Sequence, residues 1–568
     1  MTILGISCYY HDAAAVILKD GQLLAAAEEE RFTRKKHDSG FPSCAIDFCL
    51  KTANITSPNI DWVVFYEKPF IKFERITLSA LALAPSARQT FINTYTTWLK
   101  NKLWIKSQII KKLKISDQQI LFCGHHLSHA ASAYYASGFD SAALLTCDGV
   151  GEWTTTSFGR AHDNKLSLDW EIKFPYSLGL FYSAFTQYLG FEVNEGEYKV
   201  MGLAPYGRPE YYDKINKLIT QTNDGSFQID LSYFDYYKSD KLAFSDRLVR
   251  LLGIPPQQSE KSDQIIPAYA NIAASVQKVL EEKLLAIAKY VKQQTGEQNL
   301  CYAGGVALNG VANWKIFQEA GFANIFIQPA AGDSGGALGA ALYVYHHILG
   351  HKRVFVQNHC YWGQQNNLAD IKKFIDSNNI KATFLSDDNL EDRLVDLLTD
   401  KKVVGWVKGR FEWGPRALGA RSILADPRDK KMKELVNSKI KFREGFRPFA
   451  PVVINEKGHD YFETGQNPPS LVEYMLAVVP VKPEKRSQLG AITHVDGTAR
   501  PQFIKKNINP CYWRLVNKFG QATGTPVLLN TSFNLKGEPI VNTYGEAFDT
   551  FTKSRLDALV LENYLLEK

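Results

Sequence analysis

Three short apolar runs, each followed at once by a glycine-rich loop, place the strongest constraint on how this chain can fold. The runs cover residues 142–147, 300–303 and 325–327, and the loops after them contain DGVGEW, GGVALNG and GDSGGALGAA. Ligands of α/β proteins gather at loops that follow strand ends, where glycine lets the backbone approach them closely. The loops lack the spacing of a P-loop or of a Rossmann fingerprint. The pattern therefore predicts an α/β protein with a nucleotide site of another kind.

The length of 568 residues exceeds what one hydrophobic core supports. At the start of the chain, residues 3–9, 14–18 and 22–27 have the pattern of strands, with Asp20 and Gly21 forming a tight turn. Apolar residues recur at helical spacing over 269–292. The pattern breaks between 351 and 364, so we expect two domains, 1–352 and 353–568.

Composition narrows the class of protein. The net charge of +7, from 66 basic and 59 acidic residues, is small for this length and fits anionic small substrates without requiring nucleic acid. The eight cysteines form no CxxC pair, which argues against a zinc knuckle or a disulfide framework. The first residues lack the basic start of a signal peptide. These features predict a cytoplasmic protein without a membrane span.

One segment, residues 98–115, carries six lysines and no acidic residue, interleaved with tryptophan and isoleucine. Helices that lie in a membrane interface have this composition. A surface helix whose lysine stems cover an apolar stripe has it too, and this second interpretation is the one we favour.

The sequence GHHLSH at 124–129 is the sharpest local signal. On a helix His125 and His129 are four residues apart and face the same way, so that they can share one metal ion, whereas His126 points elsewhere. Two histidines at this spacing also occur as ordinary core or surface residues, so further ligands are needed. Asp148 and Asp333 each follow a predicted strand, although either could instead cap a turn. Two imidazoles and two carboxylates suit Fe(II), Mn or Zn.

Beyond residue 352 the chemistry changes to arginine and lysine among glycine, proline and aromatic residues. The stretch 413–449 contains Arg416, Arg421, Lys441, Arg443 and Arg447. Arginine binds phosphate or carboxylate in a bidentate manner, so this cluster predicts an anion pocket, with a solvated basic surface as the alternative. Further along, Arg500 precedes an apolar strand that ends at Asn530 and Ser532, which suit a small planar amide.

Ten sequence motifs, spread from the first residues to the C-terminus, together resemble the O-carbamoyltransferases of antibiotic and nodulation-factor biosynthesis. They are YYHDAAAV, EEERFTRKKHD, HHLSHAASAYYASGF, DGVGEW, EYKVMGLAPYG, AGGVALNG, GDSGGALGAA, WGPRALGARSI, FREGFRPFAP and NTSFNLKGEPIV. Residues 54–117 are the main part without a match. The resemblance implies an N-terminal Kae1-like domain with the duplicated fold of actin-like ATPases, followed by a YrdC-like α/β domain. It also implies that carbamoyl phosphate and Mg-ATP form carbamoyl adenylate, from which the carbamoyl group passes to a hydroxyl of a small-molecule natural product.

The resemblance also implies roles for individual residues. His11 would be the catalytic base, although a polar residue at this place could instead only cap a turn. The iron ligands would be His125, His129, Asp148 and Asp333. The nucleotide or the adenylate would contact Lys36, Asp148, Gly149, Gly151, Glu152, Gly304, Gly305, Asn309 and Asp333. Carbamoyl phosphate and ATP would be held by Arg416, Arg421, Lys441, Arg447, Arg500, Asn530 and Ser532.

Two other functions compete with this one. A tRNA-modifying enzyme would need a basic face, and only residues 98–115 and 31–37 offer one in the sequence. An actin-like ATPase acting as a switch would leave the arginine-rich C-terminal part without a role. We therefore expect small-molecule partners and neither nucleic acid nor membrane, while the acceptor alcohol, the metal and a homo-oligomeric state stay open.

Overall fold

The computed structural model describes residues 1–84, 92, 95–96, 98–100, 102–239, 241–258 and 265–568. It divides into two compact units of mixed α/β structure. The first comprises Met1–Glu29 and Ser39–Gln357, and the second comprises Glu30–Asp38 and Asn358–Lys568. The segment Glu30–Asp38 therefore belongs to the second unit, although its place in the sequence predicted that it would be part of the first domain.

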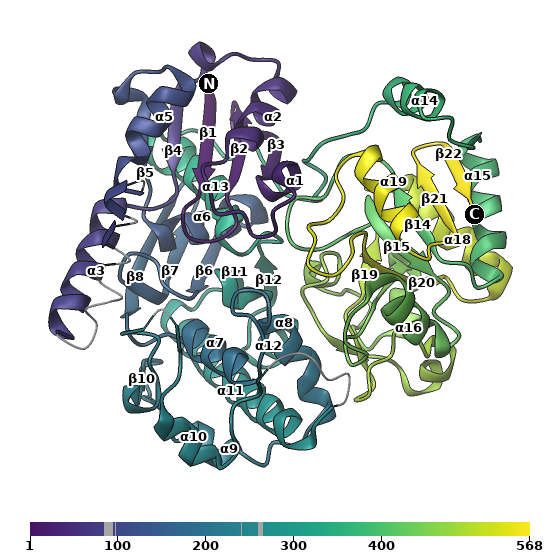
Figure 1. Ribbon diagram of the computed structural model, residues 1–568. Helices are drawn as coiled ribbons and strands as arrows, with labels where there is room; N and C mark the ends of the chain where they lie inside the picture. The colour runs from purple at the N-terminus through teal and green to yellow at the C-terminus, as the bar shows by residue number, and fades with distance from the viewer. Residues whose placement is uncertain (85–91, 93–94, 97, 101, 240, 259–264) are drawn as a thin grey trace. The chain divides into compact units, whose positions relative to one another are not determined.

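The first unit contains two five-stranded sheets with the same topology (Figure 1). The first sheet has the order β3-β2-β1-β4-β5 and the second the order β8-β7-β6-β11-β12. In each, three antiparallel strands come first and two strands parallel to the first strand follow. The strands are β1 (Thr2–Ser7), β2 (Ala14–Lys19), β3 (Gln22–Glu28), β4 (Trp62–Phe65), β5 (Ile120–Phe122), β6 (Ser141–Cys147), β7 (Thr154–His162), β8 (Lys165–Lys173), β11 (Asn299–Ala303) and β12 (Asn324–Ile327). The unit is thus a structural duplication, and the strands predicted from the sequence lie in these two sheets.

Helices cover these sheets. They are α2 (Ser43–Ala53), α3 (Pro69–Ala82), α5 (Ile105–Leu113), α6 (His125–Ser137), α7 (Leu178–Tyr188), α8 (Glu197–Leu203), α9 (Tyr212–Asn216), α10 (Asp246–Leu252), α11 (Pro267–Thr295), α12 (Gly310–Glu319) and α13 (Asp333–Leu342), with a small β9 (Ile219–Gln221) and β10 (Phe227–Ile229) hairpin. The long helix predicted over 269–292 is α11. Helix α5 falls in the lysine-rich segment and buries Ile105, Ile109 and Leu113. This agrees with a surface helix; Asn101 of that segment lies outside the described residues.

Helix α13 packs against β1, β2 and α6 (Figure 1). Glycines make the close approach necessary. A Cβ atom at Gly339 would lie 1.7 Å from the carbonyl oxygen of Ser128 on α6, and one at Gly5 on β1 would lie 2.0 Å from the carbonyl oxygen of Ala337. Because no real Cβ tolerates these distances, only glycine lets α13 sit between β1 and α6.

The second unit is built on one mixed sheet with the order β13-β22-β21-β14-β15-β20-β16-β19. Its strands are β13 (Thr383–Phe384), β14 (Val404–Val407), β15 (Arg421–Ala425), β16 (Ala450–Ile454), β19 (Gln502–Ile504), β20 (Val527–Ser532), β21 (Ala558–Leu561) and β22 (Tyr564–Glu567), with a separate β17 (Val479–Pro480) and β18 (Thr498–Ala499) pair. Its helices are α1 (Glu30–Thr33), α14 (Leu368–Ser377), α15 (Asp387–Thr399), α16 (Lys431–Val436), α17 (Gly458–Tyr461), α18 (Pro510–Thr523) and α19 (Tyr544–Lys553). Leu394 and Leu398 of α15 form a core with Trp406, Tyr512 and Phe519.

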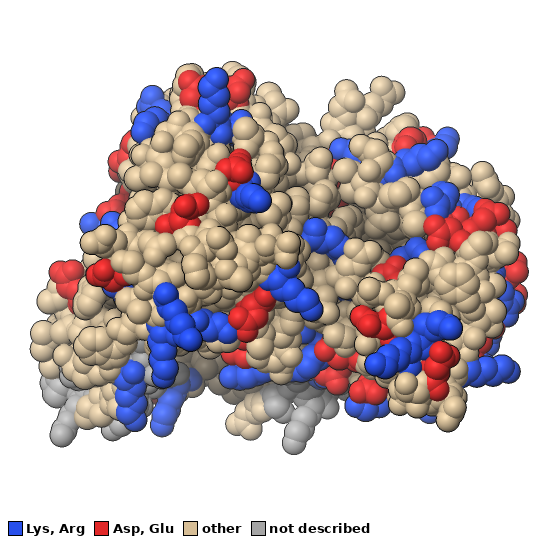
Figure 2. Space-filling view, turned by 90° about the horizontal axis from the view of Figure 1, so that it is seen from above, with Lys and Arg blue, Asp and Glu red and all other residues tan. Residues whose placement is uncertain are grey.

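The surface and the thiols bear on the competing functions. On the face of the molecule in Figure 2, basic and acidic side chains are interspersed, so that face lacks the continuous basic surface that RNA binding needs. All eight cysteines are free thiols. Among the described helices, none combines the length and the apolar character that crossing a bilayer requires.

We predict that Gly339→Ala lowers the free energy of unfolding by about 1–3 kcal/mol, because the added methyl group overpacks the contact between α13 and α6. Gly545→Ala is the matched control, since a Cβ atom there meets nothing within 4 Å. Thermal denaturation followed by circular dichroism measures both. A Gly339→Ala variant as stable as the unmodified protein would contradict the packing described here.

Candidate functional site

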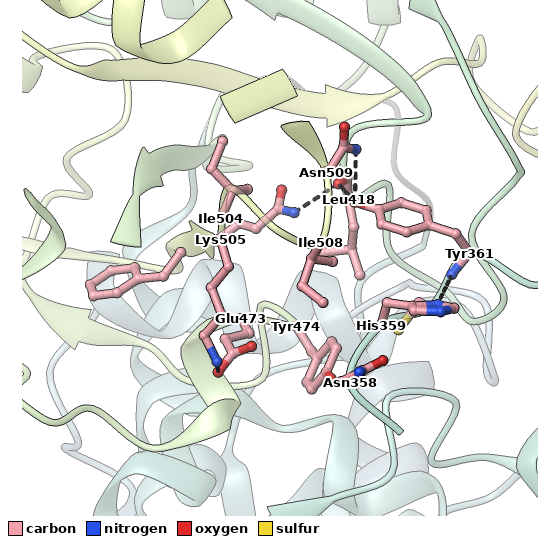
Figure 3. Close-up of a pocket in the computed structure, with 13 residues that line it drawn as sticks. Asn358, His359, Tyr361, Leu418, Glu473, Tyr474, Ile504, Lys505, Ile508 and Asn509 are labelled. Atoms are coloured by element: carbon pink, nitrogen blue, oxygen red, sulfur yellow. Dashed lines mark hydrogen bonds and ion pairs between the residues drawn. The ribbon is translucent and has the colours of Figure 1, made fainter. Parts of the chain in front are cut away.

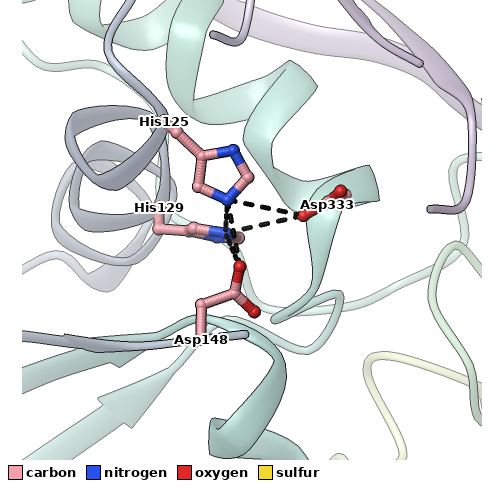
Figure 4. Close-up of side chains that lie close together, drawn as sticks. All are labelled: His125, His129, Asp148 and Asp333. Atoms are coloured by element: carbon pink, nitrogen blue, oxygen red, sulfur yellow. Dashed lines mark hydrogen bonds and ion pairs between the residues drawn. The ribbon is translucent and has the colours of Figure 1, made fainter. Parts of the chain in front are cut away.

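The first turns of α6 hold the two histidines that the sequence singled out. His125 and His129 are fully buried, and their Nε2 atoms lie 3.1 Å apart (Figure 4). The His126 ring turns away, with Nδ1 2.7 Å from the hydroxyl of Thr146. The predicted helix and the predicted directions of the three rings are therefore confirmed.

Two aspartates complete the cluster. Asp148 follows β6, and its Oδ2 atom lies 3.0 Å from His125 Nε2 and 3.8 Å from His129 Nε2. Asp333 opens α13, and its Oδ1 atom lies 3.6 Å and 3.8 Å from the same nitrogens (Figure 4). One ligand atom from each of the four residues lies within 4.8 Å of all the others. Ligand atoms about 2.1 Å from a common ion are separated by about 3–4 Å, so this group fits a metal ion.

Burial and charge act against each other in this cluster. Burial alone disfavours the charged imidazole, but hydrogen bonds to Asp148 and Glu67 outweigh it and raise the pKa of His125 to about 10. Burial also disfavours the Asp148 carboxylate, yet its contacts with the two histidines hold its pKa well below the usual value. The carboxylate of Asp148 is therefore charged and depends on nearby positive charge.

The glycine-rich loops shape the wall around Asp148. The Gly305 backbone N–H donates to Asp148 Oδ1 at 2.9 Å. Gly304 has a φ of +101°, and a Cβ atom there would lie 2.3 Å from the Cys147 carbonyl oxygen. At Gly151 a Cβ atom would lie 3.0 Å from the side chains of both His125 and His126. These glycines allow two strand ends to approach α6.

Three other predicted residues lie in the same unit. A Cβ atom at Gly149 would lie 3.2 Å from the Tyr10 hydroxyl. The Glu152 carboxylate accepts hydrogen bonds from the backbone N–H of His125 at 3.0 Å and of Lys68 at 2.8 Å, and so caps the start of α6. The Asn309 side chain accepts from the Ala312 backbone N–H at 3.1 Å and caps α12. The contacts of Glu152 and Asn309 thus serve helix starts.

His11 pairs with its neighbour: Nδ1 lies 2.6 Å from Asp12 Oδ2. Burial lowers the pKa of His11, but the Asp12 carboxylate outweighs it, and Asp333 and Asp148 add to its effect. The pKa rises to about 9. His11 therefore experiences the field of the metal-ligand aspartates.

In the second unit, basic residues gather around Lys441. Its ammonium group donates to the Ser532 carbonyl oxygen at 2.8 Å and to the Asn534 carbonyl oxygen at 3.0 Å, and it lies 3.2 Å from the Ser532 hydroxyl. Burial, followed by the charges of Arg443, Arg447 and Lys36, holds the pKa of Lys441 well below its usual value. Positive charge thus converges here, with Arg500 adding to it at Arg443.

Arg421 and Asn530 are fully buried and occupied. The Arg421 guanidinium donates to four backbone carbonyl oxygens, those of Asn542, Gly409, Ala420 and Gln364, at 2.9–3.2 Å. The Asn530 amide donates to Ala417 and Gln502. Arg421 therefore fixes the surrounding loops. Arg416 lies half-buried in the loop before β15.

The second unit also has a pocket (Figure 3). It is lined by Asn358, His359, Cys360, Tyr361, Leu418, Glu473, Tyr474, Gln502, Phe503, Ile504, Lys505, Ile508 and Asn509. An ion pair of 2.7 Å joins Lys505 and Glu473 at its wall. Gln502 also accepts a hydrogen bond from Asn530, so the pocket borders the Asn530 network without including any predicted anion-binding residue.

Sequence reasoning missed several residues around the metal-ligand cluster. Tyr66 and Glu67 follow β4, and Lys72 and Arg75 lie on α3. All four are buried. They fall in residues 54–117, where no motif guided the search, but the strand end at Phe65 was a signal that could have found the first two.

The chain was compared with known proteins. Residues 2–342 match the model of the carbamoyltransferase N-terminus, and residues 395–568 match that of the carbamoyltransferase C-terminus. The chain belongs to the carbamoyltransferase family. It is an enzyme of this class, and the resemblance to O-carbamoyltransferases seen in the sequence is confirmed.

Three relatives illustrate the range of the family. An uncharacterized protein of Synechocystis, sll1178, is 46% identical over all of this chain and 96% of its own length. The nodulation protein NolNO of Sinorhizobium fredii is 37% identical over 99% of this chain and 79% of its own. The 3'-hydroxymethylcephem-O-carbamoyltransferase of Amycolatopsis lactamdurans is 35% identical over 48% of this chain and 49% of its own. Among solved structures, HypF of T. kodakarensis aligns with 62% of this chain and 48% of its own, at a TM-score of 0.32 and 16% identity, too low to support a conclusion.

We predict that the protein binds one equivalent of a divalent metal and that His129→Ala weakens binding by more than the roughly 10- to 100-fold that loss of an outer-shell partner costs. Anaerobic calorimetric titration with Fe(II), Mn(II) and Zn(II) measures this. His162→Ala, which alters an exposed histidine of the same unit, is the control. Equal affinities for His129→Ala and the unmodified protein would rule out the cluster as the metal site.

Proposed function

We propose that this carbamoyltransferase is an ATP-dependent O-carbamoyltransferase that acts in two stages. The first unit would be Kae1-like, with an actin-like duplicated fold, and the second YrdC-like. The observation that carries the proposal is that one family chain contains both a buried His₂Asp₂ cluster and, in its other unit, a convergence of basic side chains. The first suits a metal and the second suits anionic substrates.

The second unit would form the donor. Phosphate is cleaved from carbamoyl phosphate by water, and the resulting carbamate oxygen attacks the α-phosphorus of ATP, so that pyrophosphate leaves and carbamoyl adenylate remains. Lys441 and Arg447 neutralise the phosphate charges, with Arg416 and Arg500 as further ligands. Arg421 contributes by holding the loops, because backbone carbonyls take up its donors.

Lys36 also serves this donor stage in our proposal. Its segment, Glu30–Asp38, belongs to the second unit, and its charge acts on Lys441. Arg34 anchors the segment by donating to the carbonyl oxygens of Pro539 and Ile540. Lys36 therefore joins the basic residues around Lys441, a different place from the nucleotide site of the first unit to which sequence analysis had assigned it.

The first unit would transfer the carbamoyl group. The acceptor hydroxyl oxygen attacks the carbamoyl carbon, the bond to the AMP oxygen breaks, and the hydroxyl proton passes to Nε2 of His11, whose Nδ1 is held by Asp12. A divalent ion held by His125, His129, Asp148 and Asp333, with Fe(II) as our choice, would supply a Lewis acid for the leaving phosphate. The acceptor is a small-molecule alcohol, with sugar, polyketide, alkaloid and β-lactam alcohols all open.

The donor stage gives the deciding experiment. Incubation with ATP, carbamoyl phosphate and Fe(II), without acceptor, is expected to yield pyrophosphate and the mass of carbamoyl adenylate. Arg447→Ala should abolish this yield and Lys36→Ala should reduce it, since each removes a charge from the anion site. Arg555→Ala, at an exposed position of the same unit, should leave it unchanged.

Release of ADP and phosphate regardless of carbamoyl phosphate would refute the transferase proposal. It would favour an actin-like ATPase instead. Full activity of Lys36→Ala alone would return Lys36 to the nucleotide site of the first unit.

A second experiment isolates His11. His11→Asn should lower transfer by about 100- to 10,000-fold while the adenylate still forms, because only the base is lost. Transfer by the unmodified protein should rise with pH toward about 9, since the neutral imidazole is the active form. Asp12→Asn removes the carboxylate that stabilises the imidazolium, so its pH profile should move to lower pH. Normal transfer by His11→Asn, or an unmoved Asp12→Asn profile, would exclude this assignment.

A further inference from the structure

Two consecutive residues at the end of β4 each reach a different residue of the metal-ligand cluster. The Tyr66 hydroxyl donates to Asp333 Oδ2 at 3.1 Å. Glu67 Oε2 lies 3.6 Å from Nδ1 of His125. One strand end thus contacts a carboxylate from α13 and an imidazole from α6.

The contact between Glu67 and His125 fixes the direction of the ring. His125 turns Nε2 toward Asp148, Asp333 and His129, so Nδ1 is the nitrogen that must carry the proton when the ring acts as a neutral ligand. Glu67 Oε2 is the carboxylate that faces this nitrogen. A carboxylate behind a ligand histidine orients the ring and makes the other nitrogen a stronger donor to a metal.

Lys72 completes the arrangement from α3. Its ammonium group lies 2.5 Å from Glu67 Oε2, and both side chains are no more than 4% exposed. The Tyr10 ring covers the ammonium group, with the nitrogen 4.3 Å from the ring centroid. A carboxylate this deeply buried needs a charged partner, and Lys72 supplies it.

The formal charges of the described cluster indicate the charge of its ligand. Asp148, Asp333 and Glu67 contribute three negative charges, and Lys72 contributes one positive charge. With both imidazoles neutral, two negative charges are left, which a divalent cation balances. Without Lys72 a divalent cation would leave one buried negative charge.

We propose that Glu67 and Lys72 form a positioning pair for the metal centre: Glu67 orients His125 through Nδ1, and Lys72 sets the charge of the site to suit a divalent cation. The proposal rests on the metal centre of the proposed function. Neither residue touches a substrate, so both act through His125. The pair lies in residues 54–117, the part of the chain that the sequence motifs leave unassigned.

Co(II) titration of the purified full chain tests the pair, because the absorption bands of bound Co(II) report its ligand geometry. Glu67→Gln leaves Lys72 buried without its partner, so the main test is the double variant Glu67→Gln/Lys72→Met, which removes both charges together. We expect it to bind Co(II) about 10- to 100-fold more weakly, with altered band positions and a circular dichroism spectrum equal to that of the unmodified protein. Glu74→Gln is the matched control, since Glu74 lies on the same helix but is exposed.

Each outcome separates the proposals. Unchanged Co(II) affinity and bands in the double variant would overturn the positioning role of the pair. Failure of the unmodified protein to bind Co(II) would overturn the metal centre itself and this inference with it. Carbamoyl adenylate formation in the second unit is measured separately and decides the proposed donor reaction whatever the Co(II) result.

Discussion

Three buried carboxylates, those of Asp148, Asp333 and Glu67, have to be neutralised without water, and the centre of the first unit is arranged around this requirement. Each comes from the end of a different strand. The counter-charges come from α6 and α3. Such a group forms only if α13 lies directly against α6 and β1, which glycine permits at Gly339 and Gly5. Close helix packing and charge compensation are therefore one structural problem in this unit.

The second unit solves the opposite problem. Its buried and half-buried groups are cations, and burial together with mutual repulsion depresses the pKa of Lys441 and of Arg443. A site of this kind is at its most stable with an anion bound. The two units thus have complementary electrostatics, one suited to a metal and the other to phosphates, as a reaction that makes an acyl adenylate and then consumes it would require.

The segment Glu30–Asp38 shows that the units are not simply consecutive in sequence. It leaves the first unit after β3, packs in the second through Arg31 and Arg34, and returns before α2. Arg31 donates to the Gly414 carbonyl oxygen and its guanidinium lies over the Phe411 ring. Cutting the chain near residue 358 would therefore take a basic segment away from the anion site.

The sequence by itself determined the α/β class, most strands of the first unit, helix α11, the family, and the four members of the metal-ligand cluster. It could do so because strand ends, helical spacing and glycine-rich loops are local patterns. Only the tertiary structure decided that the first unit is a duplication, that Arg421 is occupied by backbone carbonyls, that Lys36 belongs with Lys441, and that Glu67 and Lys72 stand behind His125. Those facts depend on contacts between residues far apart in the chain, and the charge of a side chain does not reveal which distant group will neutralise it.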